Sequence, residues 1–485
     1  MNVLTWARRG AIGAVGLALL GLASCDFSTL DRVDQPVVMK GSDLPTLIGV
    51  PAGSIVAFAH RRVSGSPTWT QVPVQVDERK VVDFGVGPTS NTAAGTTGTV
   101  YGTAAVGVTA LQYTDAATFV GADNDPNLDA NDELVFMASD AGGAVRPEDA
   151  TEPSGVTPGS GVKVQVRDPL EDLGVGWIYL FRSSGARTPG AGRDYVNYDF
   201  NLTSGPYRTT YKRAAGPNPE TSIVAGRTYT AGLRDRWDDS EWRITAGNAT
   251  GVDVLDGLMA RFKGTCGRSN LTFQNAEGAF VANIDGPVRA IRSYVGANSG
   301  PYTQRTNLFY RDRQEVVTDL RVHEVPPIQD FLDYSAAATG MTYRSSAHPD
   351  PVTIDGTPDP IGPELPRWEL VSGNQGSITV ASRLDTSLLG PGGNPDDLLD
   401  EYYRDDLTPE LADKPCVGDS ALIGASGAQF SQNVPNTDPL RSPFATLSAR
   451  RTVAYSAPGA TTADAARTAD QIDAPLETST TAYAP

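Results

Sequence analysis

Histidine, cysteine and basic charge are all scarce in this sequence. Its 485 residues include three His, at positions 60, 323 and 348, and three Cys. Histidines so far apart do not predict a His-rich zinc site or an HExxH helix. With 39 Lys and Arg against 57 Asp and Glu, the formal net charge is −18. A chain with this charge repels phosphate, so we expect no nucleic-acid partner.

Common catalytic and nucleotide-binding motifs are also missing. The chain has no G-x-S-x-G elbow, no Walker A loop and no G-x-G-x-x-G following an expected strand. After the N-terminal segment, no apolar run is long enough to span a membrane. No organic cofactor is therefore expected, and no local signature indicates a particular reaction.

Turn-forming residues are abundant instead. Gly 50 and Pro 35 together favour many short strands joined by turns. Residues 72–76 alternate, with Val72, Val74 and Val76 on one face, as expected of a strand. The remaining expected strands are residues 133–138, 162–166, 176–181, 279–284, 288–295, 306–310, 315–323, 368–381 and 444–454. The prediction is a mainly β protein, with residues 396–403 as a rare helix-like segment.

The expected organisation is a small N-terminal β domain followed by a larger antiparallel β-sandwich region. Residues 36–140 form the first and residues 162–455 the second, joined by a Pro/Gly/Ser-rich linker at 141–161. The last segment, residues 456–485, is rich in Ala, Thr, Asp and Pro, and its composition predicts disorder.

The N-terminus has the pattern of an export signal. Arg8 and Arg9 precede an uncharged apolar stretch, residues 10–22, which is too short to cross a bilayer. The residues Leu22-Ala23-Ser24-Cys25 that follow resemble the bacterial lipobox. This resemblance implies removal of residues 1–24, diacylation of Cys25 and a tether over residues 25–35. It places the protein in the cell envelope, lipid-anchored and extracytoplasmic, in a membrane that the sequence does not specify.

The rest of the chain resembles exported β-rich bacterial proteins, in segments such as Val72-Pro-Val-Gln-Val-Asp-Glu78 and Gly286-Pro-Val-Arg-Ala-Ile291. No named activity follows from this resemblance. An exported compartment permits disulfides, and Cys266 and Cys416 make one pair available. The alternative is two unpaired thiols.

An acidic loop carries the sharpest candidate site. Oxygen-bearing side chains recur at alternate positions, as a wrapped Ca²⁺ ion requires. The candidate ligands are Asp123, Asp125, Asn127, Asp129, Asp132 and Glu133. The start resembles an EF-hand loop, but Leu128 replaces the turn glycine and the following segment is an expected strand. A calcium loop on a β scaffold and a solvated Asx-rich turn are equally compatible with the pattern.

Two further clusters could bind a ligand. Carboxylates next to tryptophans are typical of sugar sites, and the candidates are Trp237, Asp238, Asp239 and Trp242. An exposed acidic loop anchored by the two tryptophans is favoured over a catalytic pair of carboxylates. The second cluster is a series of arginines that could hold an anion such as a uronate: Arg289, Arg292, Arg305, Arg311, Arg313 and Arg321. For these arginines, pairing with Asp and Glu on a solvated sheet face is the favoured interpretation.

Taken together, the sequence favours a lipid-anchored extracytoplasmic β protein without catalytic activity, which binds glycans or other envelope ligands or has a structural role, with a calcium loop as a candidate. The alternative is an extracytoplasmic carbohydrate-active enzyme, a glycoside hydrolase or lyase. A cleft holding two carboxylates near Trp237 or Trp242 would favour the enzyme.

Overall fold

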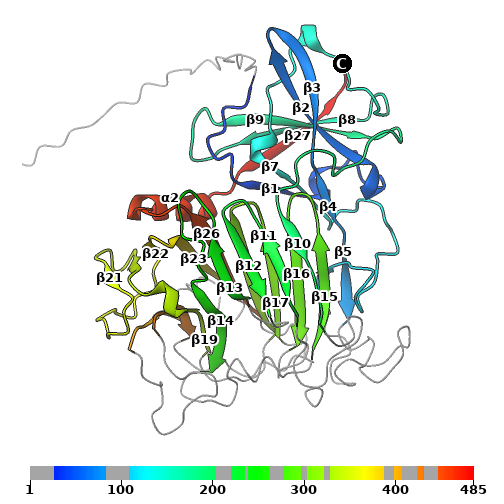
Figure 1. The fold of residues 1–485 in the computed structure, drawn as a ribbon. Coiled ribbons are helices and arrows are strands. Elements are labelled where there is room, and N and C mark those ends of the chain that lie inside the picture. The colour runs from blue at the N-terminus through cyan, green and yellow to red at the C-terminus, as the bar shows by residue number, and fades with distance from the viewer. Residues whose placement is uncertain are drawn as a thin grey trace, which may run out of the picture.

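A computed structural model describes most of the chain. The described residues are 27–83, 109–203, 220–234, 239–262, 278–296, 303–321, 328–386, 398–406, 423–430 and 446–485. Nearly all regular structure in them is antiparallel β-sheet, so the expected mainly β fold is confirmed. The sheets form two units, which lie one above the other in Figure 1.

The first unit is a sandwich of two sheets. One sheet has the order β27 (Glu477–Tyr483), β8 (Gly161–Arg167), β9 (Val175–Arg182), β2 (Ile55–Val63) and β3 (Ser66–Val72). The other has the order β1 (Pro36–Lys40), β7 (Glu133–Met137) and β4 (Gln75–Asp77). Val37 and Leu134 of the small sheet are buried in one core with Ile55, Val164 and Ile178 of the large sheet. Burial of apolar side chains between the faces stabilises this unit.

The second unit is built on a nine-stranded sheet. Its order is β15 (Gly278–Asp285), β16 (Ala290–Gly296), β17 (Thr303–Phe309), β18 (Arg313–Arg321), β26 (Thr446–Ser456), β23 (Gly376–Thr386), β22 (Glu369–Gly373), β20 (Thr342–Ser345) and β21 (Val352–Thr353). The sheet twists along its length, as large sheets do.

Two four-stranded sheets lie over the nine-stranded sheet. One runs β10 (Asn197–Asp199), β11 (Ser222–Ala225), β12 (Tyr229–Leu233) and β13 (Asp239–Ile244). The other runs β14 (Leu255–Phe262), β19 (Ile328–Tyr334), β25 (Ala425–Phe430) and β24 (Leu399–Arg404). Trp242 and Leu258 of these sheets share a core with Ile378, Val453 and Tyr455 of the nine-stranded sheet. The second unit is therefore also a sandwich.

The two units meet along β7. Val135 and Met137 of β7 pack against Ile291, Leu308 and Tyr310 of the second unit. A two-stranded ribbon, β5 (Arg79–Asp83) with β6 (Thr109–Tyr113), adjoins this contact. Because the apolar faces of the units are shared here, polar groups next to them are held in fixed positions.

The end of the chain is ordered, although its composition predicts disorder. Helix α2 (Thr462–Asp473) begins with a capping box formed by Thr461 and Asp464. Ala465 and Ala469 of α2 pack on Trp368 and Leu370. β27 then pairs with β8, so the C-terminal strand joins the N-terminal unit, as the red strand among blue and cyan strands of Figure 1 shows. Long-range pairing therefore outweighs the disorder that the composition predicts.

The boundaries between the units also differ from the expected ones. Residues 161–182, which form β8 and β9, belong to the first unit and not to the sandwich region that follows it. Residues 141–161 run along this first unit, where the N–H of Val145 donates to the hydroxyl of Tyr179 at 2.7 Å. The expected helix at residues 396–403 is wrong, because β24 pairs there with β25.

Candidate ligand-binding cleft

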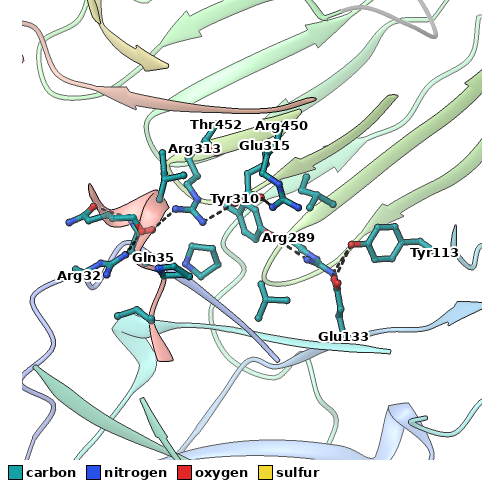
Figure 2. Close-up of a pocket in the computed structure, with 17 residues that line it drawn as sticks. Arg32, Gln35, Tyr113, Glu133, Arg289, Tyr310, Arg313, Glu315, Arg450 and Thr452 are labelled. Carbon is teal, nitrogen blue, oxygen red and sulfur yellow. Dashed lines mark hydrogen bonds and ion pairs between the residues drawn. The ribbon is translucent and has the colours of Figure 1, made fainter. Parts of the chain in front are cut away.

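A cleft of about 410 Å³ lies where the two units and the C-terminal segment meet. Figure 2 shows its lining side chains. The segment before β1 contributes Arg32 and Gln35, and β18 contributes Arg313 and Glu315. The remaining lining residues are Pro36, Val38, Tyr113, Glu133, Arg289, Leu308, Tyr310, Arg450, Thr452, Gln471, Ile472, Pro475 and Leu476. The volume lies in the range of about 300–1,000 Å³ that is usual for small-ligand sites.

The lining is basic in an acidic protein. Four arginines face two glutamates, an excess of two formal positive charges, in a chain with net charge −18. Tyr113 and Tyr310 add hydroxyl groups and ring faces. An excess of arginine over glutamate in the lining favours an anionic ligand.

The floor of the cleft is a buried ion-pair network around Arg289, whose side chain is 1% exposed. Its Nε donates to Asp77 Oδ2 at 2.9 Å and its Nη2 donates to Glu133 Oε2 at 2.6 Å. Tyr113 donates to Glu133 at 2.9 Å, and Arg79 donates to the other oxygen of Glu133 at 2.7 Å. Burial by itself would raise the pKa of Glu133, but Arg289 and Arg79 outweigh it, so the pKa is lowered.

Gln75 fixes the backbone that carries Arg289. Its side-chain oxygen accepts the N–H groups of Val288 at 3.1 Å and of Arg289 at 3.0 Å. Gly286 makes this approach feasible, because a Cβ atom there would lie 2.3 Å from the same oxygen of Gln75. A side chain at position 286 would therefore displace the amide of Gln75 from this position.

The rim of the cleft is held by shared arginine contacts. Glu315 accepts from Arg313 and from Arg450, each at 2.9 Å, and the Arg450 side chain is 53% exposed. Arg32 is buried and donates to Asp168 at 3.0 Å and to the carbonyl oxygens of Gln471 and Ala474 at 2.6 and 2.7 Å. Among the described residues, the Nε groups of Arg32 and Arg313 have no hydrogen-bond partner. Both nitrogens are buried.

The acidic loop uses several of its oxygens for its own backbone. Asp123, Asp125 and Asp129 each accept the N–H group two residues further on, at 3.1, 3.2 and 2.9 Å. These contacts are Asx turns, which the sequence pattern allows as the alternative to a calcium loop. Asp132 is buried, and it accepts the N–H groups of Arg79 and Asp129 at 2.7 and 2.8 Å.

The other two candidate calcium ligands differ in their contacts. Asn127 donates its amide to Asp125 at 2.5 Å, so it remains part of the loop. Glu133 belongs to the cleft floor. In the described part of the chain, no group of three or more His, Cys, Asp or Glu side chains has the arrangement of a metal site. A calcium site at this loop stays a prediction.

Of the four residues in the Trp/Asp cluster, Trp237 and Asp238 lie outside the described residues. Asp239 and Trp242 are both buried, 1% and 0% exposed. The indole N–H of Trp242 donates to Asp239 at 2.9 Å, and Gln314 donates to the same oxygen. Trp242 thus fills the sandwich core and has no ring face open to a ligand.

Four members of the arginine series are buried rather than solvated: Arg289, Arg292, Arg305 and Arg311. Arg292 is 1% exposed and donates to Glu220 at 2.9 Å, while Arg305 donates to Asp330 at 3.2 Å. Arg311 forms an ion pair with Asp34, which is half exposed. Pairing with carboxylates was the favoured interpretation, but these four guanidinium groups lie inside the protein, where partners are needed to offset desolvation. The backbone of Arg321 lies in β18.

The three cysteines, Cys25, Cys266 and Cys416, lie outside the described residues, so the lipid anchor and the disulfide remain predictions. Of the cleft, only Arg289 and Arg313 were among the candidate ligand residues, and Glu133 was a candidate metal ligand. Arg32, Gln35, Tyr113 and Arg450 were missed because they come from three distant segments. A local excess of arginine in an acidic chain was the one usable signal.

Comparison with known proteins adds little. No protein family matches the chain, and no curated protein does. A solved structure titled "Crystal Structure Analysis of HI1317" is similar with a TM-score of 0.30 and 7% sequence identity, over 53% of this chain and 99% of that chain. In the described part of the chain, no helix has the length and apolarity needed to cross a bilayer.

Proposed function

We propose that this protein is a lipid-anchored binding protein of the bacterial cell envelope and that its cleft holds an anionic glycan. The basic lining of the cleft is the observation that carries this proposal. Arginine side chains match the geometry of carboxylate oxygens. Tyrosine rings pack on the C–H faces of sugars, and their hydroxyls bond to sugar hydroxyls. Saccharides that contain uronic acids offer both features.

The position of the cleft in the chain fits an envelope ligand. Arg32 lies seven residues after Cys25, a distance that an extended chain covers with at most about 25 Å. Phe27 already pairs with Gly142 of the first unit. An acyl group on Cys25 would therefore keep the cleft near the lipid head groups, where envelope glycans are concentrated.

The carboxylates of the cleft support binding rather than hydrolysis. A glycosidase needs one carboxyl group that keeps its proton until the leaving oxygen takes it. In this cleft the pKa of Glu133 is lowered, and Glu315 is bound by two arginines. A lowered pKa keeps Glu133 ionised, and both glutamates hold arginines in place, which suits a binding site.

A glycan array tests the proposed ligand. We expect the mature protein in detergent micelles to retain uronate-containing oligosaccharides and not their neutral analogues, with binding that weakens as salt rises. Arg450→Ala should weaken binding about tenfold, the usual value of a charge-assisted hydrogen bond. Arg167→Ala is the matched control, because this arginine is 59% exposed, also pairs with one glutamate, and lies outside the cleft.

Three outcomes would contradict this proposal. Equal retention of acidic and neutral glycans would remove the ligand class, and equal losses in Arg450→Ala and Arg167→Ala would remove the cleft. Turnover of a bound polysaccharide would favour the carbohydrate-active enzyme. The anchor is tested separately with Cys25→Ser, which we expect to leave an uncleaved precursor that no longer takes up labelled palmitate. Unchanged processing and labelling would reject the lipid anchor.

A further inference from the structure

A second buried polar cluster lies away from the cleft, between the two layers of the second unit. Glu369 begins β22 in the nine-stranded sheet, and Glu401 lies in β24 of the facing sheet. Tyr343 of β20 is placed between them. The carboxyl residues are each 4% exposed, and Tyr343 is 0% exposed. This cluster is the polar contact that joins the layers at this end of the sandwich.

The hydrogen bonds of the cluster require a proton that ionised glutamates do not have. The hydroxyl of Tyr343 lies 3.1 Å from Glu369 Oε1 and also forms a hydrogen bond with Glu401 Oε1. A tyrosine hydroxyl has one hydrogen, so it donates to one carboxyl only. In the second contact the carboxyl must be the donor, and a carboxyl donates only when it is protonated.

No cation supplies an alternative to that proton. Among the described residues, neither carboxyl forms an ion pair with Lys or Arg. Arg451 of β26 lowers the pKa of Glu369 through its charge, but the nearest carboxylate to it is Asp330, at 3.7 Å. His348 Nε2 lies 3.6 Å from Glu401 Oε2, beyond hydrogen-bond distance, and it accepts the N–H of Gly362 at 3.0 Å.

The other groups that face the cluster are neutral or acidic. Ser345 of β20 bonds to Glu401, and Ser426 of β25 bonds to Glu369. Tyr334 of β19 shares a hydrogen bond of 2.8 Å with Ser426. The acidic groups are Glu364 beside Glu401, and Asp359 and Asp405 beyond the ring of Tyr403, which lies 4.5 Å from that of Tyr343. The acidic groups disfavour a second negative charge in the cluster.

We propose that the Glu369–Tyr343–Glu401 cluster is a proton-binding site that holds the two layers together when occupied and loosens them when the proton leaves. With the proton bound, both contacts of Tyr343 are hydrogen bonds. Without it, two carboxylates face one hydroxyl in a dry site and repel each other. The cluster makes stability of the second unit respond to the acidity of its surroundings. This proposal does not depend on the lipid anchor or on the cleft. Arg450 lines the cleft, and Arg451, whose charge acts on Glu369, points to the opposite face of β26.

The direction of the effect follows from the two protonation states. Burial raises the pKa of both Glu369 and Glu401 from the ordinary 4.5 to about 7, and the charge of Glu401 adds to the rise at Glu369. The stabilisation is complete below about pH 4.5, where the glutamates are protonated in the folded and in the unfolded protein. It is lost as the pH rises through about 7. The equilibrium constant for unfolding should grow by up to about tenfold per pH unit in this window for one proton.

The first test needs no substitution. In wild-type protein labelled with ¹³C at the glutamate carboxyl groups, we expect two carboxyl resonances that titrate near neutral pH. Glu369→Gln and Glu401→Gln should each remove one of them and lower the midpoint of the other, because the repelling charge is gone. Aspartates are unlabelled and do not interfere. If every glutamate in the wild-type protein titrates below about pH 6, near the ordinary range, the proposal is wrong.

The second test measures stability. Urea unfolding is measured between pH 5 and 8. In the wild type the equilibrium constant for unfolding should rise by up to about tenfold per pH unit, and in Glu401→Gln it should rise less. Glu364→Gln is the matched control, because it removes a nearby exposed charge and leaves the pair intact. Equal pH dependence in the wild type and in Glu401→Gln would overturn the proposal. If Glu401→Gln does not fold, the titration of the wild-type protein decides.

Discussion

The cleft floor and the Glu369–Glu401 cluster both bury two carboxyl groups, but they do so by opposite means. At the floor, Asp77 and Glu133 face Arg289 and Arg79. The two arginines lower the pKa of Glu133, whereas burial outweighs Arg289 at Asp77 and raises its pKa. In the cluster, no arginine pairs with either carboxyl among the described residues, and both pKa values rise to about 7. The two sites differ in the positive charge that is buried with the carboxyl groups: guanidinium groups at the floor and a proton in the cluster.

This difference has a consequence for how the molecule responds to its surroundings. A guanidinium does not titrate in the range where proteins are folded, so the floor of the cleft stays charged and fixed. A shared proton can leave, so the cluster changes state close to neutral pH. The rigid arrangement lies where a ligand would bind, and the variable one lies where two sheets meet.

Removing the guanidinium should have the largest effect. In Arg289→Ala the floor keeps two buried carboxylates without their main partner, and loss of one member of a buried ion pair costs about 3–5 kcal/mol. We expect a fall of this size in the free energy of unfolding, measured with urea at pH 7. Arg227→Ala is the control, since its ion pairs with Asp34 and Asp312 involve a side chain that is 50% exposed, and it should cost at most about 1 kcal/mol. Similar costs for both variants would contradict the comparison.

The contributions of Glu133 and of the Glu369–Glu401 cluster to stability should depend on pH with opposite signs. Because the folded-state pKa of Glu133 lies below the ordinary 4.5, its contribution to stability is present above pH 4.5 and is lost as the pH falls through the folded value. Glu133→Gln should therefore cost about 1.5–3 kcal/mol at pH 7, the value of hydrogen bonds to a charged group, and less in acid. Glu401→Gln should instead show its largest benefit above pH 7. Unfolding curves of both variants from pH 3.5 to 8 would show whether the trends diverge; parallel trends would refute the distinction.

The cleft floor could be predicted in part from the sequence, whereas the Glu369–Glu401 cluster could not. Alternation in strands such as residues 133–138 and 315–323 depends on neighbouring residues, so these strands could be predicted. The arginine excess around Arg289 is also local. The proton-binding cluster combines positions 343, 369 and 401, and nothing near Glu369 in the sequence distinguishes it from the other acidic residues of the chain.

Long-range pairing explains the errors as well. Residues 399–404 have no strong strand pattern, and they are a strand because β25 provides the hydrogen bonds. The alanines of residues 460–469 suggest a flexible tail, yet Ala465 and Ala469 recur four residues apart and fit a helix face against Trp368 and Leu370. Trp242 was a candidate ligand-binding residue beside acidic side chains, but Asp239 accepts its indole N–H inside the core.

The acidic loop is a third way to hold carboxylates, and it offers the smallest effect. Asp123, Asp125 and Asp129 are exposed or half-buried, and their charge adds to burial in raising the pKa of Glu78. If the predicted calcium site exists, its affinity should be in the millimolar range of extracellular modules. We then expect 10 mM Ca²⁺, about ten times such a Kd, to raise the free energy of unfolding by about 1.4 kcal/mol in the wild type and not in Asp125→Asn/Asp129→Asn. Magnesium at the same concentration is the control for ionic strength. The absence of a calcium-specific gain would show that Asx turns and solvent satisfy these carboxylates without a bound cation, in contrast to the carboxylates of the floor and of the cluster.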